Sequence, residues 1–314
     1  MKIIDIHAHL GQDLFGTSDS NLDVYIDGAR KIGITKTIFI PTPTCLINKL
    51  DGTYAGCLWK KDPGGKINYY ILNNNKINKN PSNPYKIINN YIYSIIKYAN
   101  QKNNIRFYFS PIVHPILDEP EIFKKYLTLK DTKAIKVHGV ATYTSPKDMP
   151  KWIIEFSKKY NKPLIIHTDF CQYKKTYTDL ENAYLKNIPR DWVIWASENN
   201  VKVNFAHGLR GDSKAINLAN KCENITVGIS PDLLLKSEPK RLSTKEDYLE
   251  YILNNIDENK LMFDTDFSWN IKKRGEWNKL DWGLPKRISK IYKLLGKNTA
   301  KVFHKNAERF FNLS

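Results

Sequence analysis

The sequence predicts a (β/α)8 TIM barrel, and three observations lead to that prediction. Eight short apolar segments recur along the 314 residues, and a segment with helical spacing follows each of them. Parallel strands joined by helices wind right-handed, and eight of them close into a barrel with a filled interior. The first strand contains His-Ala-His and lacks the glycine-rich phosphate turn expected in a doubly wound open sheet, so the barrel is favoured.

The predicted elements alternate from one end of the chain to the other, in a single domain spanning residues 1–314. The strands are predicted at Lys2–His9, Thr37–Ile40, Ile105–Val113, Ala134–His138, Leu164–His167, Val201–Ala206, Ile225–Ile229 and Lys260–Asp264. The helices are predicted at Leu22–Ile32, Pro84–Asn100, Glu121–Leu129, Lys147–Tyr160, Asp191–Asn199, Lys214–Cys222 and Lys245–Asn255, with further helices after Leu284 and Thr299. The first helix stops at Gly33, a common residue just past a helix end.

The segment Cys45–Asn83 interrupts this alternation between the second strand and its helix. It is rich in Asn, Lys, Gly and Pro and is longer than a strand-to-helix connection requires. In a barrel such a loop emerges on the catalytic face. Trp59, Tyr69 and Tyr70 could pack over a ligand, which favours a lid, and a solvated surface insertion is an equally weighted alternative.

Composition narrows the class of protein. No apolar run has the length of a membrane span, and Asp5 interrupts the apolar start, so neither a membrane anchor nor a signal peptide is expected. The four cysteines have irregular spacing, which favours free thiols in a cytoplasmic protein. A homodimer is one assembly that the sequence leaves open.

The formal net charge is +17, which could indicate an anionic partner such as nucleic acid. Lys outnumbers Arg 41 to 8, however, and the positive charges are scattered without a dense arm. Lys is also the weaker residue for bidentate phosphate recognition. We therefore interpret the charge as surface composition and expect a small-molecule substrate in place of nucleic acid.

Several of the predicted strands end in polar residues of the types that bind metal ions. His7 and His9 are two residues apart on one strand, so both point to the same side. His167, His207 and Asp266 close or follow the fifth, sixth and eighth strands. Each alone is more simply a hydrogen-bonded polar residue. Together, at the strand ends where barrel active sites lie, they indicate a shared divalent metal.

With these residues in this order, the chain resembles the amidohydrolase superfamily. It resembles in particular the amidohydrolase 2 branch, which contains aminocarboxymuconate-semialdehyde decarboxylase and related hydrolases. The matching segments are IDIHAHL (4–10), PLIIHTDF (163–170), VNFAHGLRGD (203–212), LMFDTDF (261–267) and NTAKVFHKNAERFFNL (298–313). The resemblance implies that His7, His9, His167 and Asp266 bind the metal. It also implies that His207 lies beside the activated water, as an acid/base or a further ligand. Relatives often have Gly where this sequence has Asp264, so the resemblance implies that Asp266 is the family aspartate. Asp264 is a second acid that could be confused with it.

Three further residues are candidates for substrate binding. Lys136 lies in the same predicted strand as His138. A carbamylated Lys136 could bridge two metal ions, as in some branches of the superfamily. An unmodified, charge-paired lysine is the preferred interpretation. His138 could bind substrate or form a local hydrogen bond, and Arg210 could clamp a carboxylate or pair with Asp212. The glutamate that TatD-like nucleases use near the fourth strand has no clear equivalent here.

The resulting hypothesis is a metal-dependent hydrolase that directs metal-activated water at a C–O or C–N bond of a small substrate. Three nitrogens and a carboxylate suit one zinc ion, and Asp266 or His207 would take the proton. A non-oxidative decarboxylase using the same site is the alternative. A nucleic-acid-binding module and a barrel without catalytic activity are further options, and the complete residue set argues against the latter.

Overall fold

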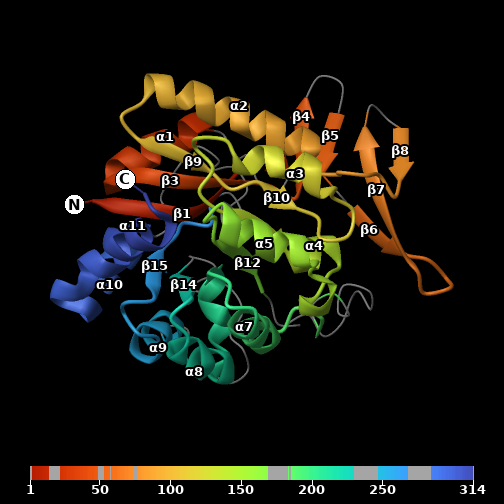
Figure 1. The fold of residues 1–314 in the computed structure, drawn as a ribbon. Coiled ribbons are helices and arrows are strands. Elements are labelled where there is room, and N and C mark those ends of the chain that lie inside the picture. Colours follow the sequence, from red (N-terminus) through yellow and green to blue (C-terminus); the bar gives the residue numbers. More distant parts are fainter. Residues whose placement is uncertain are drawn as a thin grey trace.

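The computed structural model describes residues 2–13, 22–48, 53–56, 58–73, 76–168, 183, 185–229, 247–267 and 284–313. Within these ranges the chain forms a parallel β-barrel surrounded by helices (Figure 1). The wall strands are, in order, β1 (Ile3–Leu10), β3 (Ile34–Pro41), β9 (Arg106–Phe109) continued by β10 (Ile112–Val113), β11 (Ile135–His138), β12 (Leu164–His167), β13 (Val203–Phe205), β14 (Ile225–Ile229) and β15 (Leu261–Phe263).

The barrel closes between its first and last strands. Neighbouring wall strands pair in parallel in sequence order. A parallel bridge joins Ala8 to Phe267, and the amide of His9 donates to the carbonyl of Phe267 over 3.3 Å. The predicted TIM-barrel class is therefore confirmed, and the doubly wound open sheet is wrong.

The third wall strand is broken where the sequence predicts one continuous strand. β9 pairs with β3 and β10 pairs with β11, with Ser110 and Pro111 between them. Pro111 has no amide hydrogen to donate to a neighbouring strand. The side chain of Asn89 supports the second half by bonding both the amide and the carbonyl of Ile112, each over 2.9 Å.

Helices surround this wall and close one of its ends. They are α1 (Leu22–Ile32), α2 (Lys86–Lys102), α3 (Pro120–Leu127), α4 (Gly139–Thr142), α5 (Lys151–Lys159), α7 (Pro189–Glu198), α8 (Ser213–Lys221), α9 (Asp247–Asn255), α10 (Leu284–Leu295) and α11 (Asn306–Phe311). Helical spacing explains their packing, as in α2, where Ile88, Ile92 and Ile96 recur every four residues and are fully buried. The predicted helices match these within a few residues at each end, and the short α4 was not predicted.

A separate apolar cluster fills the barrel interior and the end of the barrel where its strands begin. Inward-facing Ile4, Ile6, Ile38 and Ile40 pack together, and residues of α11 and the chain end join them. Phe311 and Leu313 belong to this cluster, so the last helix closes the barrel beside the starts of its strands. Both chain ends accordingly lie on one side of the molecule in Figure 1.

The insertion after the second wall strand folds into two small antiparallel sheets. Its strands are β4 (Thr44–Asn48), β5 (Thr53–Gly56), β6 (Leu58–Lys61), β7 (Ile67–Asn73) and β8 (Lys76–Lys79). β4 and β5 form one sheet with β2 (Gln12–Asp13), and β6, β7 and β8 form the other. In Figure 1 they gather on the right, opposite the two chain ends and therefore at the carboxyl ends of the barrel strands.

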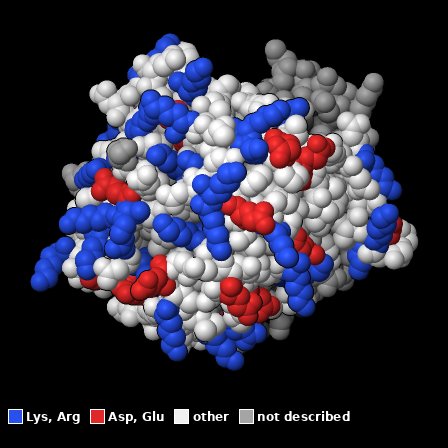
Figure 2. Space-filling model, viewed as in Figure 1, with Lys and Arg blue, Asp and Glu red and all other residues white. Residues whose placement is uncertain are grey.

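The face of the molecule drawn in Figure 2 carries its positive charge in a dispersed form. On the face drawn in Figure 2, Lys and Arg side chains are spread over several elements and Asp and Glu side chains lie between them. No helix among the described residues combines the length and the apolar character needed to cross a bilayer.

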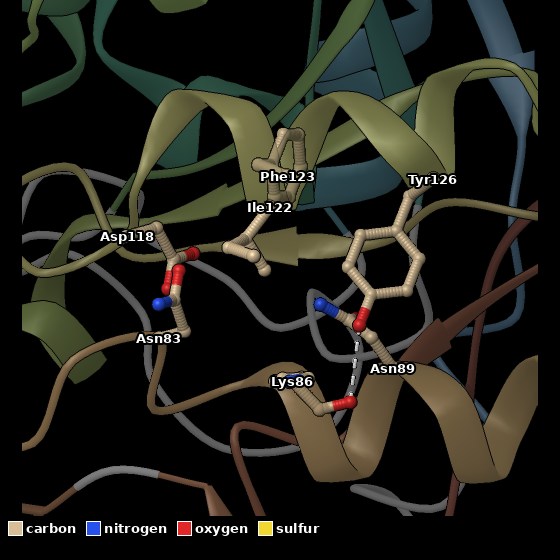
Figure 3. A pocket seen from close by; sticks show the side chains of 7 residues that line it. All are labelled: Asn83, Lys86, Asn89, Asp118, Ile122, Phe123 and Tyr126. Carbon is tan, nitrogen blue, oxygen red and sulfur yellow. Dashed lines mark hydrogen bonds between the residues drawn. The ribbon is translucent and has the colours of Figure 1, made fainter.

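A narrow cleft between α2 and α3 contains a buried carboxyl group outside the barrel (Figure 3). Asp118 is 9% exposed, and its Oδ2 accepts a hydrogen bond from the amide of His114 over 2.8 Å. Its Oδ1 faces the cleft beside Asn83 and has no hydrogen-bond partner among the described residues. Burial raises the pKa of this carboxyl to about 7, because its charged form is poorly solvated there.

This pKa makes a prediction for Asp118→Asn. Between about pH 4, where the carboxyl of the unfolded chain titrates, and the native pKa of about 7, only the native state holds this proton. Wild-type stability should therefore fall as pH rises through that window, and the Asn variant should lack the fall. Denaturant unfolding from pH 4.5 to 8 measures it, with the surface variant Asp191→Asn as control. Parallel curves for wild type and Asp118→Asn would contradict the prediction.

Candidate metal centre

The strand β1 brings two imidazoles to one point inside the barrel. All eight of its residues are buried, and His7 and His9 face the interior with their Nε2 atoms 3.0 Å apart. The register between β1 and β3 shifts between Asp5 and Ala8. This irregularity lets Ile6 and His7 both face inward, and the regular alternation then keeps His9 on the same side.

Asp266 approaches the same point from beyond β15. Its Oδ1 lies 3.8 Å from Nε2 of His7 and 3.5 Å from Nε2 of His9. Its backbone has a φ of 46°, which is unusual for a residue with a side chain, and its amide donates to the carbonyl of His7 over 2.9 Å. The eighth strand thus delivers a carboxylate to the two histidines of the first.

These three side chains fit a divalent metal. They form the group that could hold an ion among the described residues, and all three are buried. Three atoms at the observed separations are equidistant from a common point at about 2 Å, the length of zinc–nitrogen and zinc–oxygen bonds. Two imidazole acceptors and one carboxylate are also the donor types that such metals use.

Burial keeps the imidazoles in the neutral form that a metal ligand requires. Loss of solvation lowers the pKa of His7 well below its ordinary value, and nearby Lys136 lowers it further. Burial likewise lowers the pKa of His9, while the Asp266 carboxylate and the Pro41 carbonyl oppose that shift. The site therefore offers lone pairs without first having to release protons at neutral pH.

His167 and His207 lie together beside this cluster. Nε2 of His207 is 2.9 Å from Nδ1 of His167, and Nδ1 of His207 is 3.8 Å from Oδ2 of Asp266. Burial, followed by the nearby Arg210 guanidinium, lowers the pKa of both imidazoles well below the ordinary value. His167 is outside the three-residue group in this conformation, so its role as the fourth ligand stays a prediction.

A strained turn presents His207 and Arg210. All five residues from 207 to 211 have positive φ, between 51° and 68°. Left-handed backbone costs residues with side chains about 1–2 kcal/mol each, so Gly208 and Gly211 ease this turn. Fully buried Leu209 and the capping Asp212, whose carboxylate accepts from the first amides of α8, hold it in place. The Nε of Arg210 donates to the carbonyl of Thr168 over 3.4 Å.

Lys136 and Asp264 occupy the interior next to the cluster. Nζ of Lys136 is 3.1 Å from Nε2 of His7, and burial lowers its pKa to about 7 against the opposing effect of Asp266 and Asp264. A Cβ at Gly228 would lie 2.1 Å from Oδ2 of Asp264, so the glycine makes room for this second carboxylate. Asp266, and not Asp264, is the acid that completes the histidine pair.

His138 stacks on His167 with ring centroids 4.0 Å apart. Its Nδ1 accepts a hydrogen bond from the amide of Ala141 over 3.2 Å, at the start of the short α4. The proton of a neutral ring is therefore on Nε2, and burial lowers the pKa of His138 well below its ordinary value. His138 thus combines a local structural bond with a donor atom beside the candidate ligands.

Asp5 and Thr265 belong to the site although the sequence alone did not indicate them. The Asp5 carboxylate is fully buried and bonds both His7 and Thr265, the residue before Asp266. The signal was present in Ile-Asp-Ile-His-Ala-His, where an acid stands two residues before the first histidine of an otherwise apolar strand. Its partner could not be found from sequence because it is 260 residues away.

Comparison with solved structures shows full-length likeness at low sequence identity. A probable 2-pyrone-4,6-dicarboxylic acid hydrolase from Acinetobacter baumannii, crystallised with citric acid bound, has a TM-score of 0.59 at 12% identity, covering 100% of both chains. A 2,6-dihydroxybenzoate decarboxylase from Rhizobium has a TM-score of 0.57 at 11% identity and 99% coverage of both. A protein described as amidohydrolase II has 0.58 at 12%, covering 99% of this chain and 100% of its own.

No protein-family profile matches the chain. The comparison with curated proteins finds no match either. At the level of the fold, the resemblance to amidohydrolase 2 type proteins is confirmed by these solved structures, which are similar over the full length of the chain. The structure adds a buried His-His-Asp cluster at the place where the resemblance expects a metal.

The cluster predicts the metal content of the purified protein. Wild type should contain about one divalent ion per chain, and His9→Ala should lose most of it after dialysis because two of three ligands hold an ion poorly. His114→Ala is the control, since His114 is equally buried but lies outside the group. Elemental analysis of folded protein measures the content. Equal content in wild type and His9→Ala would contradict the site, and two ions per wild-type chain would indicate a carbamylated Lys136.

Proposed function

We propose that this protein is a metal-dependent hydrolase that uses activated water against a C–O or C–N bond of a small substrate. The observation that carries the proposal is the convergence of His7, His9 and Asp266 inside the carboxyl end of the barrel. A divalent ion held there, proposed to be one zinc with His167 as a further ligand, would activate water and polarise a substrate oxygen.

Asp266 and His207 are the proposed proton acceptors. They are 3.8 Å apart, and both lie beside the two histidines of β1. His207 is neutral because it is buried near Arg210, so it can accept a proton from water. Nε2 of His207 contacts Nδ1 of His167, which orients the ring so that Nδ1 of His207 lies toward Asp266.

The proposed substrate carries a carboxylate. Arg210 supplies a positive charge close enough to His167 and His207 to lower their pKa values. His138 is a donor next to His167, and Lys136 adds a further cationic group deeper in the site. The structural neighbours include a probable 2-pyrone-4,6-dicarboxylic acid hydrolase with citric acid bound and a 2,6-dihydroxybenzoate decarboxylase.

Decarboxylation is the second candidate function. One neighbour is a decarboxylase, and its chain matches this one from end to end as well as the hydrolases do. The same proton carriers would then deliver a proton to carbon as carbon dioxide leaves. A substrate panel separates the two: matched lactones, amides, esters and aromatic carboxylic acids, each assayed for hydrolysis and for released carbon dioxide. Faster turnover of neutral analogues than of carboxylates would contradict the proposed role of Arg210.

The insertion is proposed to cover the site and influence substrate choice. Nε1 of Trp59 donates to the carbonyl of Val140 over 2.9 Å, and its ring lies 4.6 Å from that of Tyr143. Tyr69 packs edge-on against His114, with centroids 4.6 Å apart. These contacts join β6 and β7 to the segments that follow the third and fourth wall strands, next to His138. An ordered cover at this end would exclude water from a bound substrate.

His207→Asn is expected to separate catalysis from metal binding. The variant should keep its metal, since His207 is outside the three-residue group, yet lose at least about 100-fold in kcat through loss of the proton acceptor. Asp266→Asn should lose both. Steady-state kinetics on the best panel substrate, with metal content measured on the same samples, test this. A wild-type rate in His207→Asn would remove that residue from the mechanism.

Trp59→Ala tests the proposed cover. The substitution removes the bond to Val140 and the contact with Tyr143, so KM should rise several-fold or substrate preference should change, with metal content unchanged. Tyr98→Ala, at an exposed position on α2, is the matched aromatic control. If both variants have wild-type KM and preference, the insertion is not a substrate-selecting cover.

A further inference from the structure

The Asp5 carboxylate joins the two ends of the chain at the barrel wall. Its Oδ1 accepts from the amides of His7 over 3.2 Å and Thr265 over 3.0 Å. Its Oδ2 accepts from the hydroxyls of Tyr25 and Thr265, each over 2.6 Å. Four donors on one fully buried carboxylate make a rigid junction between β1, α1 and the segment after β15.

This junction lies on the outer side of the wall, away from the candidate ligands. Tyr25 belongs to α1, which packs outside the barrel, and its hydroxyl also contacts the Thr37 hydroxyl of β3 over 2.8 Å. The irregularity in β1 after Asp5 explains how neighbouring residues divide: Asp5 faces α1 while His7 faces the interior. Asp5 and Thr265 therefore do not share the inner side of the wall with a substrate.

The junction nevertheless acts directly on the segments that carry the ligands. It bonds the backbone of His7 itself and both the backbone and the side chain of Thr265, which precedes Asp266. The Thr265 hydroxyl also accepts from the amide of Phe267 over 3.2 Å, which clamps the residues on both sides of Asp266. Such clamping can hold Asp266 in its left-handed conformation.

The usual way to orient a metal-binding histidine is a hydrogen bond from its second ring nitrogen to a carboxylate or carbonyl. Nδ1 of His7 has no such partner among the described residues. The hydrogen bond that the His7 amide donates to Asp5 instead holds this residue through its backbone.

We propose that Asp5 and Thr265 form a positioning pair that sets the metal affinity of the site by holding His7 and Asp266 at their mutual separation. The inference rests on the proposed metal centre and adds residues that touch neither metal nor substrate. Loss of either half of the pair should leave all ligand side chains present but less well placed. Metal should then bind more weakly even where the fold is retained.

The experiment compares Thr265→Val with Thr265→Ser. Valine has nearly the shape of threonine but lacks the hydroxyl that bonds Asp5 and Phe267, whereas serine keeps it. Tyr25→Phe removes a different donor to Asp5 without altering the Thr265–Asp266 segment. Thr299→Val is the matched control, since it deletes a buried hydroxyl that bonds the Gly296 carbonyl far along the chain. Direct substitution of Asp5 is avoided because the variant could fail to fold.

Zinc dissociation constants, measured by competition with a chromophoric chelator, are the readout, with melting temperatures of the metal-free proteins alongside. We expect Thr265→Val to bind zinc at least about tenfold more weakly, the size typical of lost supporting contacts. Tyr25→Phe should show a smaller loss, and Thr265→Ser and Thr299→Val should bind as wild type does. Comparable melting temperatures of Thr265→Val and Thr299→Val would separate positioning from general destabilisation.

Wild-type affinity in both Thr265→Val and Tyr25→Phe would overturn the proposal, as would an equal loss in Thr265→Ser and Thr265→Val. A wild-type protein that takes up no zinc or other divalent metal would instead contradict the proposed function, and the positioning role with it.

Discussion

The contact between the first and last barrel strands is the constraint on which the rest of the structure depends. A parallel barrel exists only if its last strand returns to its first, and here Asp5 and the Ala8–Phe267 bridge make that closure. The same closure brings Asp266 against His7 and His9. Because one junction serves both purposes, the stability of the barrel and the geometry of the candidate site are coupled.

Electrostatics explain why so many basic side chains can gather in the interior. His7, His9 and His207 are buried, His138 and His167 are partly buried, and loss of solvation lowers the pKa of each. Neutral imidazoles do not repel one another, and Lys136 lies where Asp264 and Asp266 offset its charge. The interior thus tolerates a polar group that would be costly if its members were charged, and it keeps their lone pairs available to a metal.

Two left-handed stretches of backbone lie at the candidate site. The left-handed turn from 207 to 211 and the left-handed Asp266 both lie at the carboxyl ends of strands. Most of the remaining wall residues are apolar and pack on both sides of the wall. Unfavourable backbone conformations persist when surrounding contacts hold them, and the buried Leu209 and the Asp5 junction provide such contacts.

The sequence by itself determined the barrel and the strand ends at which polar residues meet, because apolar periodicity and the alternation of strands and helices are local properties of the chain. It also placed His7, His9 and Asp266 at one end, since parallel strands share a carboxyl edge. Only the tertiary structure decided the shifted register of β1 and the outward direction of Asp5. It also decided that the insertion forms sheets and that His167 sits beside His207. These features arise from contacts between residues far apart in sequence, as between Asp5 and Thr265, and no local pattern encodes such contacts.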